Sequence, residues 1–126
     1  MLDPSGRHAR VFKSAWFSKA AHKTGIADQE LCIAIRQVML GQAVDLGGGV
    51  FKKRLDRNRS RAIILAKAGA RWVYEYLFAK KDGDNISADE LTKFRKLANA
   101  YETLTEEQVR RLILEGDWVE ICDDSE

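Results

Sequence analysis

The chain has 126 residues, of which 45% are hydrophobic and 32% charged, and its formal net charge at pH 7 is +2. This length is enough for one domain with a real core and too short for two, so we expect a single domain over residues 1–126. No apolar run approaches the ~20 residues that span a bilayer. The N-terminus also lacks the apolar segment of a secretory signal. These patterns predict a cytoplasmic protein without a membrane association.

The charges are distributed unevenly along the chain. Residues 50–81 contain ten Lys and Arg against two acidic residues, a local net charge of +8. Residues 82–126 contain thirteen acidic residues against five basic ones, a local net charge of −8. Because the basic segment also alternates in the manner of β-strands, it predicts a sheet face that binds a polyanion. The simpler interpretation is a solvated basic face, partly neutralised by the chain's own acidic tail.

The first part of the chain predicts a helical hairpin. Residues 1–9 are expected to form a frayed lead-in. Ser14 is placed to cap a helix that ends at about Lys23. Asp28 is placed to cap a second helix over about residues 29–39, whose apolar residues follow helical spacing. Only a few residues join the two helices, so they are expected to be antiparallel.

After the hairpin the hydrophobic period changes from 3.6 to 2. Strand-like segments follow at residues 44–46, 50–55, 61–66 and 71–80. Capping boxes that begin at Ser87 and Thr105 open two further helices. A last strand is expected at residues 117–121 and an acidic tail at 122–126. The order predicts an α+β fold, in which an N-terminal two-helix hairpin packs on a small antiparallel β-sheet, with additional C-terminal helices and a final strand.

The cysteines and histidines do not indicate a metal site. Cys32 and Cys122 lie ninety positions apart and form no Cys-x-x-Cys motif. In a chain without an export signal both are expected to be reduced. His8 and His22 are isolated and expected to lie on the surface. Together these residues do not supply a zinc ligand set, so we expect no metal and no other cofactor.

The basic strands carry the candidate chemistry. Lys52 and Arg54 are two residues apart on a strand and should project from the same face into solvent, about 7 Å apart. Arg61 opens the next strand and Lys80 closes the one after. RNA cleavage can use the substrate's own 2′-OH, so such cations need only orient it and stabilise charge on the phosphorane. Arg suits the second task, and a Lys crowded by other cations can act as a base.

Two other patterns concern ligand binding. Residues 47–49 are three glycines that precede a strand and lack the phosphate-loop pattern, so they predict a turn or a close backbone approach. The aromatic residues are expected mostly in the core, with one or two of residues 72–78 free to stack on an unpaired base. Glu75, within this run, is expected to face solvent or to pair with an arginine.

From about Phe12 to Ile121 the chain resembles the RelE/ParE-like toxins of bacterial type II toxin–antitoxin systems, in a RelE- and HigB-like branch. The resemblance rests on Lys19, Gly25, Ile26, Asp28 and Leu31 in the hairpin, then Asp45–Val50 and Lys52–Arg54, Phe78–Lys80, Asp84–Ile86, Glu90 with Leu91, and Leu114–Asp117. The glycine-bearing and lysine-bearing blocks are fairly specific together, whereas either alone would be weak.

This resemblance implies a compact α+β toxin with two helices on a four-stranded antiparallel sheet. Members of the RelE-like branch are metal-independent mRNA interferases, which typically cut mRNA in the ribosomal A site by 2′-OH attack. The catalytic residues carried over by motif are Lys52, Arg54, Arg61 and Lys80, and RNA binding is assigned to Lys53, Arg57, Arg59 and Lys81. A cognate antitoxin, usually a DNA-binding protein encoded in the adjacent gene, would hold the toxin inactive.

Two alternatives remain open. Relatives commonly carry a Gly-Lys-Ser-Gly-Gly-Tyr-Arg-like loop, whereas residues 56–61 here contain no glycine and no aromatic. The chain is therefore either a nuclease, a ParE-like toxin that inhibits DNA gyrase without catalysis, or a degenerate member that only binds nucleic acid or a partner. Fold alone does not choose between these. The clustering of basic residues on a strand face favours the nuclease.

Overall fold

The computed structural model describes residues 1–123, so the last three residues of the predicted acidic tail lie outside the described part. The strands are β1 Arg10–Ser14, β2 Val44–Gly47, β3 Val50–Leu55, β4 Ser60–Leu65, β5 Arg71–Ala79 and β6 Trp118–Ile121. The helices are α1 Ala15–Thr24, α2 Asp28–Met39, the short 3₁₀ helix η1 Lys80–Asp82, α3 Ala88–Glu102 and α4 Glu106–Leu114.

The helices begin largely where their caps predict. The Ser14 side chain accepts a hydrogen bond from the Phe17 backbone N–H (3.1 Å), and the capping boxes at Ser87 and Thr105 are both formed. One cap is different, because Ala27 is the N-cap of α2 and makes no side-chain bond. Asp28 is instead the first helical residue, where its negative carboxylate interacts favourably with the positive end of the helix dipole.

The strands form one six-stranded sheet in the order β2-β3-β4-β5-β1-β6. Its strands pair antiparallel except β1 and β5, which run parallel from Arg10–Arg71 to Lys13–Tyr74. The expected small antiparallel sheet is therefore wrong, and the sheet is mixed. No bounds were predicted for β1, because this five-residue strand runs directly into α1 without a turn that would mark its end.

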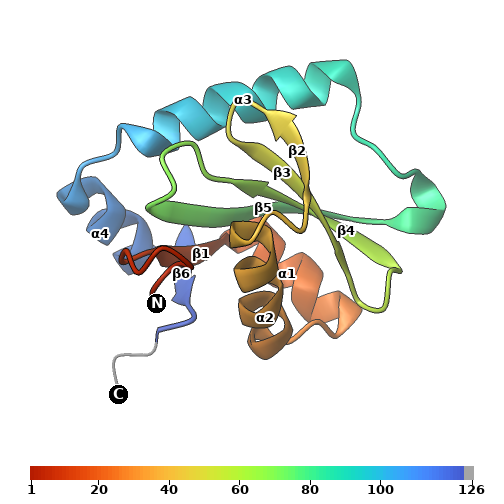
Figure 1. The fold of residues 1–126 in the computed structure, drawn as a ribbon, viewed down its shortest axis with the longest axis horizontal. Coiled ribbons are helices and arrows are strands. Elements are labelled where there is room, and N and C mark those ends of the chain that lie inside the picture. The colour runs from red at the N-terminus through yellow and green to blue at the C-terminus, as the bar shows by residue number, and fades with distance from the viewer. Residues whose placement is uncertain (124–126) are drawn as a thin grey trace.

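Helices cover both faces of the sheet (Figure 1), so the N-terminal hairpin accounts for one face only. On that face, α1 and α2 bury Phe17, Leu31 and Ile35 against the sheet. On the other face, α3 packs over the end of the sheet that holds β3 and β4, where Ala98 joins their core residues. The helix α4 lies at the β1–β6 end, where Val109 is fully buried.

Gly47 ends β2, and Gly48 and Gly49 form the β2–β3 turn that the sequence predicts. Gly48 and Gly49 have φ of +67° and +85°, a region that favours glycine. A Cβ on Gly48 would lie 2.7 Å from Arg95 Cγ, and one on Gly49 would lie 3.0 Å from the backbone of Lys67. The turn therefore needs glycine both for its conformation and for the close approach of its neighbours.

Both ends of the described chain are tied to the fold. Residues 1–9 are not frayed, because the Met1 amino group donates to the Ala9 carbonyl (3.2 Å) and Leu2 bridges His8. The expectation of reduced cysteines is also wrong, since Cys32 on α2 and Cys122 after β6 form a disulfide with Cα atoms 5.4 Å apart. The absence of an export signal predicted free thiols, whereas the fold places the two residues within bonding distance.

Candidate functional site

The candidate site lies at one end of the sheet, on the face that α3 covers. In the strand register Arg54 of β3 is opposite Arg61 of β4, and Arg61 is opposite Phe78 of β5. Directly paired residues project to the same face of a sheet. Lys52 and Arg54 are two residues apart on β3, so they also share a face. The three cations therefore share one face, as the spacing of the sequence predicts. This end is the right side of Figure 1, where β5 ends and the chain rises to α3.

The segment after η1 folds back onto these cations. Arg61 Nε donates to Asp84 Oδ1 at 2.7 Å. Lys52 Nζ donates to Asn85 Oδ1 at 2.6 Å and to the Asp84 carbonyl at 2.9 Å. The hydrogen bond from Arg61 and the charges of Lys52 and Arg54 lower the pKa of the Asp84 carboxyl. An ionised carboxylate thus lies against Arg61 and Lys52 of the cation cluster.

The role of Asp84 was not predicted from the sequence. Asp84 and Asn85 are among the residues that carry the family resemblance, but nothing in their local pattern indicates contacts with Lys52 and Arg61. The two partners lie 32 and 23 positions away from Asp84. The only available signal is an acidic residue in a turn directly after a basic strand end.

Two of the predicted catalytic cations are covered. Arg61 has a side chain that is only 2% exposed, and its Nη1 also donates to the carbonyls of Asn58 and Ser60 at 3.1 Å each. The Lys52 side chain is 10% exposed, so the expectation that it faces solvent is wrong. Oxygens of Asp84 and Asn85 accept from Lys52 Nζ, and Asp84 accepts from Arg61 Nε, so these donors are satisfied within the protein. Arg54 is exposed, as expected.

Lys80 and Lys81 lie beside the cluster without joining it. Both belong to η1 rather than to the end of β5, and both are exposed. The Lys80 backbone N–H donates to the Arg59 carbonyl at 2.9 Å. Within residues 1–123, no hydrogen bond or ion pair holds either ammonium group at the cations. The alternation of β5 therefore does not set the direction of these side chains.

The predicted RNA-binding residues of β3 and the β3–β4 hairpin separate into two groups. Lys53 lies on the opposite face, where its Nζ donates to the Gln42 carbonyl at 2.9 Å. Burial, and then the charge of Arg54, lower the pKa of Lys53. Arg57 and Arg59 are exposed in the hairpin next to the cations.

The hairpin adopts a demanding backbone conformation. Asp56, Arg57 and Asn58 have φ of +52°, +53° and +70°, a region in which residues other than glycine are uncommon. Three contacts hold this conformation. The Asp56 N–H donates to Glu30 Oε2 of α2 (2.6 Å), Arg59 pairs with the Asp56 carboxylate (2.8 Å), and Arg61 binds the Asn58 carbonyl. The hairpin thus presents Arg57 without the glycines that relatives carry.

Glu75 is neither solvent-facing nor paired with an arginine. The β4–β5 register shifts between Ile63 and Ile64, which leaves Glu75 as the extra residue of a bulge in β5. Its carboxyl oxygens accept from the hydroxyl of Tyr101 on α3 at 3.0 and 3.1 Å. Burial raises the pKa of Glu75 to about 7, and the Tyr101 hydrogen bond offsets only part of that effect.

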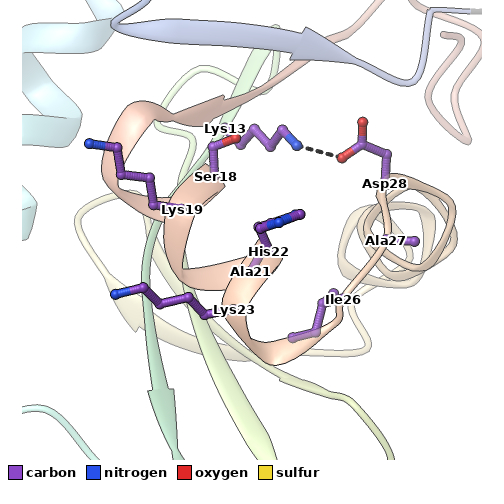
Figure 2. A pocket seen from close by; sticks show the side chains of 9 residues that line it. All are labelled: Lys13, Ser18, Lys19, Ala21, His22, Lys23, Ile26, Ala27 and Asp28. Carbon is purple, nitrogen blue, oxygen red and sulfur yellow. Dashed lines mark hydrogen bonds and ion pairs between the residues drawn. The ribbon is translucent and has the colours of Figure 1, made fainter.

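A hollow of about 530 Å³ lies away from Lys52, Arg54 and Arg61, between α1, the start of α2 and Lys13 (Figure 2). Lys13 Nζ donates to Asp28 Oδ1 at 2.7 Å on one side of it. Lys19 and Lys23 point away from that pair in the figure. The hollow contains none of the predicted site residues.

Neither a metal site nor a membrane span is found in the described chain. Over residues 1–123, no three His, Cys, Asp or Glu side chains come together in a way that would hold a metal ion. No helix in the same range is both long and apolar enough to cross a membrane.

The chain is thus a small α+β protein with a mixed sheet, helices on both faces and a cluster of cations at one end of the sheet. The model of the family described as the RelE toxin of the RelE/RelB toxin–antitoxin system matches residues 9–121. The chain therefore belongs to the RelE toxin family, which confirms the resemblance at that level. Membership implies a cognate antitoxin. A search of curated proteins finds no match to the chain.

Proposed function

We propose that this toxin is a metal-independent mRNA endoribonuclease that acts on ribosome-bound mRNA in the cytoplasm and arrests translation. The observation that carries the proposal is the convergence of Lys52, Arg54 and Arg61 from two paired strands on one face. The exposed hairpin arginines extend this positive surface. A DNA-binding antitoxin encoded next to the toxin gene is the expected inhibitor.

The proposed chemistry uses the substrate as nucleophile. The RNA 2′-oxygen forms a bond to the adjacent phosphorus and loses its proton, while the 5′-oxygen leaves and gains one. Lys52 and Arg54 stabilise the charge that builds on the phosphorane oxygens. Lys80, exposed and free to turn, positions the 2′-OH or exchanges a proton. The products end in a 2′,3′-cyclic phosphate and a 5′-hydroxyl.

The contacts of Asp84 refine the role of Arg61. Because Asp84 takes the Nε donor of Arg61 and also lies 4.0 Å from Lys52 Nζ, its carboxylate and an RNA phosphate compete for the same cations. Arg61 binds phosphate only when the Asp84 segment moves away. Until then Arg61 positions the hairpin through the Asn58 carbonyl.

The burial of Lys52 and Arg61 favours one other function. If the Asp84 segment does not move, only Arg54 and the hairpin arginines reach a ligand. The toxin would then bind nucleic acid or a partner without cleaving RNA. This is the degenerate member of the family that the altered residues 56–61 already suggest.

The two functions are separated by the Lys52→Ala/Arg54→Ala variant in a translation reaction with ribosomes. Wild type should cut the mRNA, and the double variant should lose about 10²-fold or more in rate. The Lys93→Ala/Lys96→Ala variant, which removes the same charge from exposed positions of α3, should cut normally. 2′-O-methylation should block cleavage at the modified position and nowhere else. Full toxicity in a folded Lys52/Arg54 variant would refute the assignment.

A further inference from the structure

We propose that Trp16, Tyr76 and Phe78 form a groove that binds one unpaired nucleobase of the RNA. Trp16 stacks on Tyr76 with ring centroids 4.9 Å apart and planes 25° from parallel. Tyr76 in turn lies 5.9 Å from Phe78 at 28°. Tyr76 thus lies between the other two rings and contacts both. This proposal deepens the proposed function and rests on it.

The local structure explains how the three rings meet. Tyr76 and Phe78 are alternate residues of β5 and share its α3 face, where Phe94 of α3 packs against Tyr76 at 5.9 Å. The pairing of β1 with β5 ends at Lys13–Tyr74. Beyond it, within the described residues, no strand continues that edge of β5, and Trp16 in the first turn of α1 lies there instead.

Trp16 is not simply a cover for the sheet edge. Its exposed fraction is 52%, whereas Trp72 and Trp118 are buried at 8% and 2%. An exposed tryptophan that is already held by stacking on one side presents a rigid aromatic surface on the other. Such a surface gains free energy from a flat ring at little cost in side-chain entropy.

The polar rim of the groove favours a base over a phosphate. The hollow measures about 390 Å³, and Asp82, Asn85 and Glu90 are among the polar side chains that line it. The two carboxylates repel an anion, but they accept hydrogen bonds from the exocyclic amino groups of bases. We therefore expect guanine, cytosine or adenine, which carry an exocyclic amino group, to bind better than uracil.

The groove is continuous with the cation cluster. Phe78 is the direct cross-strand neighbour of Arg61. Asn85 both lines the groove and accepts the hydrogen bond from Lys52 Nζ. An RNA strand whose phosphate lies at Lys52 and Arg54 would therefore carry a neighbouring base into the groove. The basic cluster would then contact a phosphate of the RNA, and the acidic rim of the groove would contact a base of the same RNA.

The test measures the affinity of the full chain for short, fluorophore-labelled 2′-O-methyl RNA, which the proposed chemistry cannot cleave. Trp16→Leu keeps an apolar side chain but removes the ring, and it should raise Kd about tenfold. Trp16→Phe keeps a ring and should stay within about threefold of wild type. Ile33→Ser, at an exposed apolar position of α2, should have no effect.

A second arm removes the base instead of the ring. Oligonucleotides that each lack one base should bind more weakly when the missing base is the one that occupies the groove, by the same factor as Trp16→Leu causes. With that oligonucleotide, Trp16→Leu should cause no further loss, because the two changes remove the same contact. Uracil at that position should bind more weakly than cytosine or guanine. Equal affinity of wild type and Trp16→Leu for every oligonucleotide would overturn the groove.

Failure of the groove and failure of the nuclease function give different results. If wild type cuts no mRNA but Trp16→Leu loses oligonucleotide affinity, cleavage is refuted and the groove stands. If Trp16→Leu cuts mRNA at wild-type positions and rates with unchanged affinity, the groove is refuted and cleavage stands. Protection of Trp16 from acrylamide quenching by the antitoxin alone, with no effect of RNA, would assign the groove to a protein partner and overturn the proposal.

Discussion

At the scale of single residues, the most consequential groups are two carboxylates whose surroundings shift their pKa values in opposite directions. Asp84 is ionised among cations, and its pKa is lowered. Glu75 is buried against Tyr101, and its pKa is raised. The first stabilises a closed arrangement of the site, whereas the second makes the packing of α3 on β5 dependent on pH.

Glu75 should lower stability as pH rises. Its pKa is about 7 in the folded chain against 4.5 for an ordinary glutamate, so the folded state holds the proton more tightly. The stabilisation is complete below about pH 4.5 and is lost as pH rises through about 7. Glu75→Gln keeps an acceptor for Tyr101 and should gain on the order of 1–3 kcal/mol at pH 8 but little at pH 5. Urea unfolding at both pH values measures this.

The control for Glu75 is Glu102→Gln at an exposed position of α3. It should leave the pH dependence of the unfolding free energy unchanged. An unchanged pH dependence in Glu75→Gln as well would show that Glu75 ionises freely in the folded chain.

Asp84 should compete with RNA for the cations. Asp84→Asn keeps an oxygen for Arg61 Nε but removes the negative charge. We expect several-fold tighter binding of uncleavable RNA at low salt, with a difference that shrinks at high salt. Asp89→Asn, which removes an exposed acid in the first turn of α3, should change affinity much less. Weaker RNA binding in Asp84→Asn would mean that the carboxylate orders the site rather than blocks it.

At the scale of elements, the β3–β4 hairpin combines strain with a cationic surface. The left-handed conformation of a residue with a side chain costs roughly 1–2 kcal/mol, and three consecutive residues adopt it here. Strain that tertiary contacts maintain is found at functional sites. In this hairpin the contacts come from Glu30 and Arg61, which belong to different elements.

Arg57→Gly should therefore change stability and RNA binding in opposite directions. Glycine adopts φ of +53° without strain, whereas it also adds conformational entropy to the unfolded chain. The net effect should be a free energy of unfolding that is higher by about 0.5–1 kcal/mol. RNA affinity should fall, with a salt slope smaller by about one. Arg57→Ala is the matched control, since it loses the charge and keeps the strain. Equal stability of the Gly and Ala variants would show that the hairpin is not strained.

At the scale of the whole molecule, acidic residues of the C-terminal part of the chain pair with cations both at the cation cluster, through Asp84, and at the β1–β6 end of the sheet. Arg10 pairs with Glu120 of β6 and with Glu106 of α4, which also binds Arg71. These acids neutralise the β1–β6 end of the sheet, and β6 is the edge strand opposite β2. The part of the acidic tail that the structure describes thus begins far from the cation cluster in strand order. Asp124–Glu126 lie outside the described residues.

The disulfide joins α2 to the residue that follows β6. Cys32 and Cys122 are separated by 90 residues, and closing such a loop in the unfolded chain corresponds to about 4–5 kcal/mol in the entropic account. Reduction should lower the unfolding free energy by ~2–4 kcal/mol in urea titrations. The Cys32→Ser/Cys122→Ser variant should have the unfolding free energy of the reduced wild type, and reductant should not change it. Equal stability with and without reductant in wild type would contradict this prediction.

Local sequence patterns determined much of this protein. Caps and helical spacing predicted the four α-helices, because a helix depends on residues three or four positions apart. Alternation alone placed Lys52 and Arg54 on one face, and three glycines predicted the β2–β3 turn. The motifs of residues 45–54 and 78–86 identified the family.

Only the tertiary structure decided the rest, because each remaining feature joins residues that are far apart in the sequence. The parallel pairing of β1 with β5, the Cys32–Cys122 bond and the Asp84–Arg61 contact have no local pattern. The bulge at Glu75 likewise depends on the register of two strands and on Tyr101 of a distant helix. Burial of a charged side chain is favourable only when a partner satisfies it, and for Arg61 that partner comes from another loop. Its sequence neighbours could not reveal it.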